Sequence, residues 1–119
     1  PLRIIMVAKQ LQRMCYTPMN KYTIFRMPAE DDENYDQHEL VGVEYGEDIY
    51  DVTDRLIQAV CEDLSENPEY ALCDVGAYPP DDLDGGADAP YQYQMSGIVS
   101  PAYAEANTVI FYGISEVRE

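Results

Sequence analysis

The sequence predicts a single α+β domain, in which an antiparallel sheet of four to five strands carries one amphipathic helix packed on one face. The chain of 119 residues has the length of one domain, and 46% of its residues are hydrophobic, enough for one core. Apolar residues recur every three or four positions only in the segment after Asp48, whereas several short segments are rich in β-branched and aromatic residues. One helix among several strands follows from these patterns.

The first two predicted strands are residues 2–14 and residues 21–27, which are rich in β-branched residues. Residues 17–20 (TPMN) favour a turn between them, so we expect a β-hairpin at the start of the chain. A third strand is predicted at residues 40–45. It follows the acidic stretch of residues 29–39, which has no periodicity and is expected to be a solvated loop.

An apolar stripe at three- and four-residue steps predicts a helix over residues 48–65. The stripe consists of Ile49, Val52, Leu56, Val60 and Leu64. The carboxylate of Asp48 can accept a hydrogen bond from the free N–H groups at the start of the helix. Pro68 favours an end close to Asn67, because the residue before a proline avoids the helical region.

The second half of the chain is predicted to contain two further strands. Residues 70–75 fit either a short strand or a helical turn, and residues 78–88 are expected to be a loop because they are rich in Pro, Gly and Asp. Residues 91–99 and residues 108–117 read as strands. Residues 100–107 join them, most simply as a hairpin.

Charge is divided unevenly along the chain. Residues 1–28 hold five of the seven basic residues and no acid, whereas residues 29–119 hold all 23 acids together with Arg55 and Arg118. The formal net charge of −16 far exceeds the magnitude of about 2 to 8 that suffices for solubility of a small domain. Since the repulsion between carboxylates opposes folding, the acidity indicates a role other than solubility.

No catalytic motif is present, and we expect neither an enzyme nor a cofactor. His38 is the only histidine and has no nucleophile at a recognisable spacing, so it is expected to lie on the surface. Cys15, Cys61 and Cys73 lack C-x-x-C spacing, which predicts free thiols and a reducing compartment. The longest apolar run, residues 4–8, is far shorter than the roughly 20 residues of a membrane span, so a cytoplasmic protein without membrane contact is expected.

The segment of residues 81–88 (DDLDGGAD) resembles a calcium loop in composition but not in spacing. Only two acids stand at alternate positions, and Tyr91 stands where such a loop requires a glutamate. We therefore expect no metal, and a loop that is either merely solvated or binds a partner.

Acids lie at both ends of the predicted helix: Asp48, Asp51 and Asp54 near its start, and Glu62, Asp63 and Glu66 near its end. The first group suits the helix dipole, whereas negative charge at the C-terminal end is unfavourable by roughly 0.3 to 1 kcal/mol for each residue. Stability does not explain the second group. A solvated row at three- and four-residue steps is also expected, formed by Asp51, Arg55, Gln58, Glu62 and Glu66.

Tyrosine is frequent, with 11 residues, and it is enriched in interfaces because it joins an apolar ring to a polar tip. Most of these residues are expected in the core or the sheet. Several stand beside acids or in loops, where they could anchor a partner: Tyr35, Tyr45, Tyr50, Tyr78 and Tyr103.

A small folded polyanion can occupy a groove that grips nucleic acid, because such grooves are basic. The leading expectation is therefore a nucleic-acid mimic, an inhibitor encoded by a phage or mobile element that acts in the host cytoplasm on a CRISPR effector or restriction enzyme. The alternatives are a halophile domain whose acids keep it hydrated, and an adaptor that binds a cationic protein without mimicry. Direct binding to nucleic acid is not expected, since the net charge repels phosphate.

The residues expected to contact the partner are the acids of the two loops and of the helix end, with one tyrosine. They are Glu30, Asp31, Asp32, Glu33, Tyr35, Asp36, Glu62, Asp63, Glu66, Asp81, Asp82 and Asp84. The basic residues of the first segment are expected to pair with carboxylates from later segments.

Overall fold

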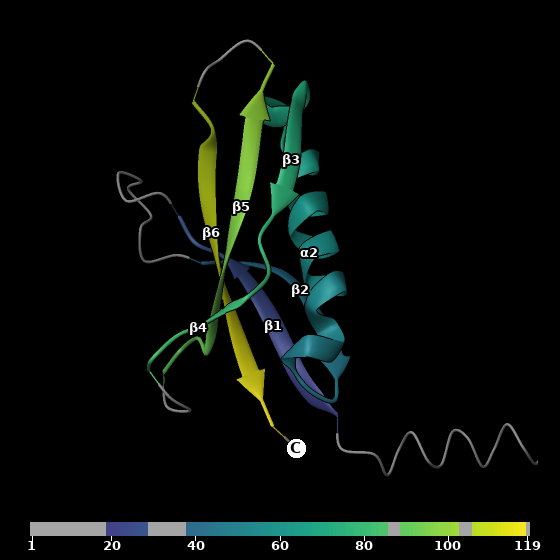
Figure 1. Ribbon diagram of the computed structural model, residues 1–119, viewed down its shortest axis with the longest axis vertical. Helices are drawn as coiled ribbons and strands as arrows, with labels where there is room; N and C mark the ends of the chain where they lie inside the picture. Colours follow the sequence, from purple (N-terminus) through teal and green to yellow (C-terminus); the bar gives the residue numbers. More distant parts are fainter. Residues whose placement is uncertain (1–18, 29–37, 86–88, 103–105, 119) are drawn as a thin grey trace, which may run out of the picture.

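The computed structural model describes residues 19–28, 38–85, 89–102 and 106–118, which form an α+β fold with one helix against a curled antiparallel sheet (Figure 1). The predicted fold class is confirmed. The elements in chain order are β1 (Asn20–Arg26), β2 (Glu39–Gly46), α2 (Ile49–Glu66), the 3-10 turn η1 (Pro68–Tyr70), β3 (Cys73–Ala77), β4 (Asp81–Asp82), β5 (Tyr93–Pro101) and β6 (Thr108–Val117).

The strands lie in the order β2-β1-β6-β5-β3, and the two residues of β4 pair with the start of β5. All neighbours are antiparallel. β1 has β2 on one edge and β6 on the other, so the predicted hairpin that pairs it with residues 2–14 is wrong. Residues 2–14 themselves lie outside the described part of the chain.

The core lies between α2 and one face of the sheet. Four residues of the predicted stripe are completely or almost completely buried, and Ile49 is half-buried. The helix stripe packs on alternate residues of β1, β5 and β6, as expected when a 3.6-residue period meets a two-residue period. The sheet side of this core consists of Tyr22, Ile24, Met95, Val99, Tyr112 and Ile114. Each large apolar side chain buried here stabilises the fold by about 1.5 to 3 kcal/mol.

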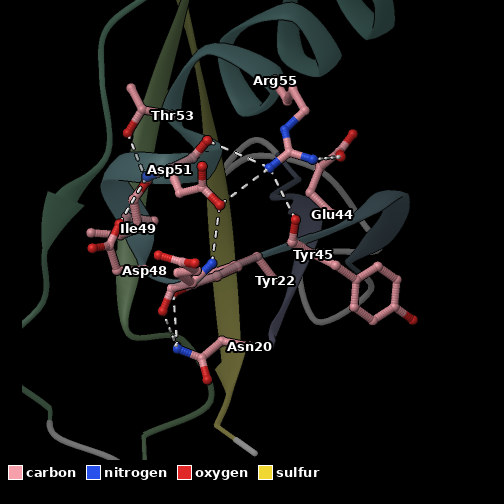
Figure 2. A network of polar contacts seen from close by, with 10 residues as sticks. Asn20, Tyr22, Glu44, Tyr45, Asp48, Ile49, Asp51, Thr53 and Arg55 are labelled. Atoms are coloured by element: carbon pink, nitrogen blue, oxygen red, sulfur yellow. Dashed lines mark hydrogen bonds and ion pairs between the residues drawn. The ribbon is translucent and has the colours of Figure 1, made fainter. Parts of the chain in front are cut away.

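The helix begins at a cap made by two carboxylates (Figure 2). The N–H of Asp51 donates to Asp48 Oδ1 at 2.9 Å, and the N–H of Glu47 donates to Asp51 Oδ2 at 3.0 Å. Asp51 N–H is one of the donors that a helix start leaves free, and the side chain of Asp48 satisfies it. The predicted role of Asp48 as the cap is confirmed.

The helix ends as predicted. Asn67 N–H donates to the carbonyl oxygen of Leu64 at 3.2 Å, and the side chain of Asn67 accepts a hydrogen bond from Glu69 N–H at 3.0 Å. Asn67 has extended backbone angles, which are the angles that a residue preceding proline favours. The ambiguous segment of residues 70–75 contains the end of η1 and the start of β3, so both readings of it are partly right.

The remaining strand predictions agree with the structure within two residues at each end. β6 has the predicted bounds, and β5 begins and ends two residues later than expected. The predicted loop of residues 78–88 contains one departure, because Asp81 and Asp82 form β4 against Gln94 and Tyr93. Residues 86–88 of that loop, and residues 103–105 of the predicted hairpin, lie outside the described residues.

Candidate functional site

The described part of the chain holds fifteen carboxylates and four basic residues. Twelve of these carboxylates are exposed. Five carboxylates form ion pairs with arginine, and the other ten have no ion pair with another described residue. Those ten, all exposed, are Glu47, Asp48, Asp54, Glu62, Glu66, Glu69, Asp74, Asp81, Asp82 and Asp84. Anionic charge therefore remains largely uncompensated at the surface.

The solvated row predicted for the helix is present, and all five of its members are exposed. Its C-terminal half carries Glu62 and Glu66, and the last turn of α2 contains no basic residue. Gln58 Nε2 donates to Glu62 Oε1 at 3.0 Å, one turn along the row. Glu69 in η1 continues the exposed carboxylates beyond the helix end.

The N-terminal half of the row is tied to the sheet by Arg55 (Figure 2). Arg55 Nη2 donates to the carbonyl oxygen of Tyr45 at 2.9 Å and lies 3.9 Å from Asp51 Oδ2, while Nη1 lies 3.7 Å from Glu44 Oε2. Arg55 thus offsets two carboxylates at this end of α2. The uncompensated charge of the row is concentrated at Glu62 and Glu66.

Asp63 does not belong to this exposed set, and the interpretation that stability leaves it unexplained is wrong. Its side chain is only 14% exposed. It accepts hydrogen bonds from Arg26 Nη1, at 2.8 Å and 2.9 Å, and from the Tyr112 hydroxyl at 2.6 Å. The unfavourable position of Asp63 near the helix end is therefore offset by partners on the sheet.

Arg26 forms ion pairs with two carboxylates. One is Asp63 on α2, and the other is Glu39 on the neighbouring strand β2. Burial works against the charge of the guanidinium, but Asp63 and Glu39 outweigh burial and raise the pKa of Arg26 above its usual value. This pair of contacts confirms, for Arg26, the expectation that early basic residues pair with later acids. Lys21 has no ion pair with another described residue, and Arg3, Lys9 and Arg13 lie outside the described part of the chain.

The predicted acids of the second loop lie far from the helix end. Asp81, Asp82 and Asp84 are exposed, and the first two form β4 at the start of β5. The end of α2 leads through η1 into β3, whose first residue pairs with Pro101 at the opposite end of β5. Gln94, the partner of Asp81, lies seven residues before Pro101 on β5, which corresponds to about 24 Å at 3.4 Å per residue. The structure does not unite the acids of the loop and of the helix end in one cluster.

The predicted first acidic loop lies outside the described part of the chain. Glu30, Asp31, Asp32, Glu33, Tyr35 and Asp36 all lie in residues 29–37, outside the described part of the chain. Of the five tyrosines predicted as anchors, three are described, and all three are exposed: Tyr45 at 50%, Tyr50 at 85% and Tyr78 at 61%. Tyr103 is not among the described residues.

Glu116 accepts hydrogen bonds in a polar cluster with Tyr93 and Arg118 that the sequence analysis did not predict. Its carboxylate accepts hydrogen bonds from the Tyr93 hydroxyl at 3.1 Å and from Arg118 Nε at 2.7 Å. Burial favours the protonated acid, but hydrogen bonds from Arg118, Tyr22 and Tyr93 outweigh it and lower the pKa of Glu116. Burial and the neighbouring Glu116 raise the pKa of Tyr93 to about 12. The sequence signal for this cluster is the two-residue period of β6, which places Glu116 on the same face of the sheet as the buried Tyr112 and Ile114.

The chemistry of the other described residues is limited. His38 is exposed and stacks on Tyr91, with ring centroids 5.4 Å apart, and its Nδ1 contacts the Tyr91 hydroxyl. Cys61 and Cys73 are free thiols, while Cys15 is not described.

Within residues 19–28, 38–85, 89–102 and 106–118, no three His, Cys, Asp or Glu side chains are grouped to hold a metal ion. The same residues include no helix with the length and apolarity needed to cross a membrane.

No family model matches this chain, and neither the curated proteins nor the solved structures include a significant match. What the protein binds must therefore be inferred from the chemistry of its own surface. The features available for that inference are the exposed acids, which are offset by few cations, and the rigid helix that carries part of them.

Proposed function

We propose that this protein is an acidic mimic of nucleic acid. In this proposal it inhibits a host defence complex, such as a CRISPR effector or a restriction enzyme, by occupying the basic channel that binds nucleic acid. The observation that supports the proposal most directly is the excess of fixed, exposed carboxylates, ten of which have no ion pair with another described residue.

The spacing of these acids is compatible with a basic groove. Glu62 and Glu66 lie one helical turn apart, which corresponds to about 6 Å along the axis of α2. A nucleic-acid strand in B form presents one phosphate per about 3.4 Å of axis, so a groove that follows it has closely spaced cations. Carboxylates on a folded helix meet such cations without the loss of backbone freedom that a disordered acidic tail suffers on binding.

The proposed mechanism is competition for one site. The anionic field speeds the encounter with a basic channel, and the bound protein then excludes phosphate from the cations that it covers. Inhibition by occupancy requires neither a catalytic group nor a cofactor. It predicts that the protein and nucleic acid cannot be bound to the target at the same time.

The test uses the full chain and a panel of purified CRISPR effectors and restriction enzymes. Binding of a fluorescent duplex or guide RNA to each enzyme is measured by anisotropy as the protein is added. The expected result for a target is loss of nucleic-acid binding, reversed by excess duplex or guide. Unimpaired nucleic-acid binding by an enzyme saturated with the protein would rule out mimicry for that enzyme.

A matched pair of variants tests the role of the helix end. Glu62→Lys with Glu66→Lys changes the net charge by four units and removes the proposed contact. Asp54→Lys with Asp74→Lys makes the same change of net charge at exposed acids outside the proposed contact. A loss of inhibition by the first variant that clearly exceeds the loss by the second supports a specific surface. Equal losses would mean that only the total charge matters.

A further inference from the structure

The face of the sheet opposite α2, which we call the open face, exposes large apolar side chains. The members that are more than a third exposed are Leu40, Val43, Tyr45, Val109, Phe111 and Val117. Strand alternation explains the position of five of them, and the register shift between β1 and β2 at Ile24 and Phe25 brings Leu40 to the same face. Contiguous exposed apolar surface usually marks a place where another segment or molecule binds.

The register of the strands places these residues on one face of the sheet. Lys21 lies between Tyr45 on β2 and Val117 on β6, and Thr23 lies between Val43 and Ser115. Further along the sheet, Val109 pairs with Ile98 and Phe111 with Ser96. In the described strands, the charged residues in phase with this face are Lys21, Asp74 and Asp81. The open face is thus much less charged than the helix side of the molecule.

Part of the open face is already covered by the chain itself. A Cβ atom on Gly113 would lie 2.7 Å from the ring of Tyr91 and 2.8 Å from Met27 Cε, so these two side chains lie directly over the glycine. Tyr91 also contacts Phe25, with ring centroids 5.7 Å apart. The exposed residues on β2 and at both ends of β6 remain beyond this cover.

We propose that the N-terminal segment, residues 1–18, docks on the open face. This segment lies outside the described residues, and its sequence has the required chemistry. It contains seven large aliphatic or methionine side chains, three basic residues and no acid. The apolar residues are Leu2, Ile4, Ile5, Met6, Val7, Leu11 and Met14, and the basic ones are Arg3, Lys9 and Arg13.

The point at which the chain enters the sheet favours this occupant. Asn20 begins β1 beside Gly46, at the end of the sheet where Tyr45 and Val117 are exposed. Eighteen residues span about 27 Å even as a helix, and the ten residues of β6 span about 34 Å. The segment can therefore reach most of the face. Its connection to β1 also gives it a high effective concentration there.

Charge favours the same occupant over a second copy of the protein. Two molecules with a net charge of −16 repel each other, whereas a cationic segment is attracted to the acidic domain. Docking would bury apolar groups on the open face and bring the basic residues Arg3, Lys9 and Arg13 close to a carboxylate at its edge, such as that of Asp81. The proposal is independent of the contact proposed for Glu62 and Glu66, because these two residues lie on the exposed side of α2 and not on the open face.

Cys15 provides the test, because it is the native thiol of the segment. In a full-length chain with Cys61→Ala and Cys73→Ala, a nitroxide on Cys15 should remove most of the intensity from the NMR signals of Val43, Val109 and Phe111. Signals from Gln58 and Glu62, on the far side of α2, should keep theirs. Reducing the nitroxide should restore all signals. Equal intensity at the open face before and after reduction would overturn the proposal.

Three further measurements keep the test decisive. In the wild-type chain, methyl NOEs between Val7 or Leu11 and Val43 should appear without any substitution. Phe111→Lys should abolish the broadening at Val43 and Val109, whereas the control Gln58→Lys should not. A mixture of nitroxide-labelled chains at natural isotope abundance with isotope-enriched chains that carry no nitroxide reports only broadening between two molecules. Broadening that appears only in such mixtures would show that a second copy covers the face and would overturn docking within one chain.

Discussion

Asp63, in the last turns of α2, holds Arg26 at the end of β1 through two hydrogen bonds from Nη1, of 2.8 Å and 2.9 Å. The two residues are 37 positions apart in the chain, and their contact fixes the end of the helix on the sheet. Tyr112 on β6 donates to the same carboxylate. One acid of the helix end thus serves the fold, whereas its neighbours Glu62 and Glu66 face solvent.

Asp63→Ala should therefore destabilise the protein. The substitution leaves Glu39 as the ion-pair partner of Arg26 among the described residues and removes the acceptor of the Tyr112 hydroxyl. Together these losses should cost about 1 to 3 kcal/mol of unfolding free energy. Urea denaturation followed by circular dichroism measures the loss. Glu62→Ala, one position earlier and exposed, is the control and should change stability by less than about 0.5 kcal/mol. Equal effects of the two variants would contradict the structural role of Asp63.

Glu62→Lys and Glu66→Lys should keep or raise stability. Replacing acids by cations at a helix C-terminus is favourable by about 0.3 to 1 kcal/mol for each residue, and neither carboxylate has an ion pair in the described structure. Thermal unfolding of the two single variants and the double variant measures this. A marked fall in melting temperature would show that these acids stabilise the fold, and would remove the reason to assign them to a partner.

Gly46→Ala should destabilise the junction between β2 and α2. A Cβ atom at this position would lie 2.5 Å from Val52 Cγ1 and 2.7 Å from Asp51 Oδ2, closer than such atoms approach in proteins. Relief requires displacement of a buried side chain and of the helix cap, at a cost of about 1 to 3 kcal/mol. Gly42→Ala on the same strand is the control, because a Cβ there meets nothing within 4 Å. Denaturant midpoints of the two variants should differ clearly.

Alkaline pH should destabilise the protein partly through Tyr93. The pKa of Tyr93 is raised to about 12 in the fold, from a usual value of 10.0, because burial and Glu116 disfavour the phenolate. Its contribution to stability is thus complete below the usual pKa and is lost as pH rises from about 10 to about 12. Tyr93→Phe should flatten the fall of unfolding free energy over this range. An unchanged pH profile in the variant would contradict the assignment.

The dependence of target affinity and of folding on salt concentration should distinguish a nucleic-acid mimic from a protein adapted to high salt. Exposed charges are screened over about 8 Å at physiological ionic strength, so affinity for a basic target should fall steeply as salt is added. The protein alone should keep its circular dichroism spectrum in dilute buffer. Unfolding in dilute buffer would support the halophile alternative, whereas an affinity insensitive to salt would support an adaptor that binds through apolar contacts.

The sequence by itself determined the fold class, the helix and the exposed row on it. These features depend on local patterns: the period of apolar residues from Val52 to Leu64, the capping carboxylate of Asp48, and the proline that follows Asn67. Because each signal lies within a few residues of the structure that it specifies, one sequence was enough to place α2 and the main strands within about two residues.

The position of Asp63 could also have been predicted, in part. It lies three residues after Val60 and seven after Leu56, on the apolar side of the helix. That position indicates a carboxylate close to the sheet, and a partner for it. The identity of the partner could not be read, because Arg26 reaches Asp63 only when β1 packs beneath the end of α2.

Only the tertiary structure decided the strand order, the separation of the acids and the open face. Pairing β1 with β2 and β6 joins segments that are tens of residues apart, and local sequence carries no signal for such choices. The same pairing places Asp81 and Asp82 at one end of β5 and Cys73, the first residue of β3, at the other. It also gathers Val43, Tyr45 and Phe111 on one face, since neighbours across a sheet are set by register rather than by distance along the chain.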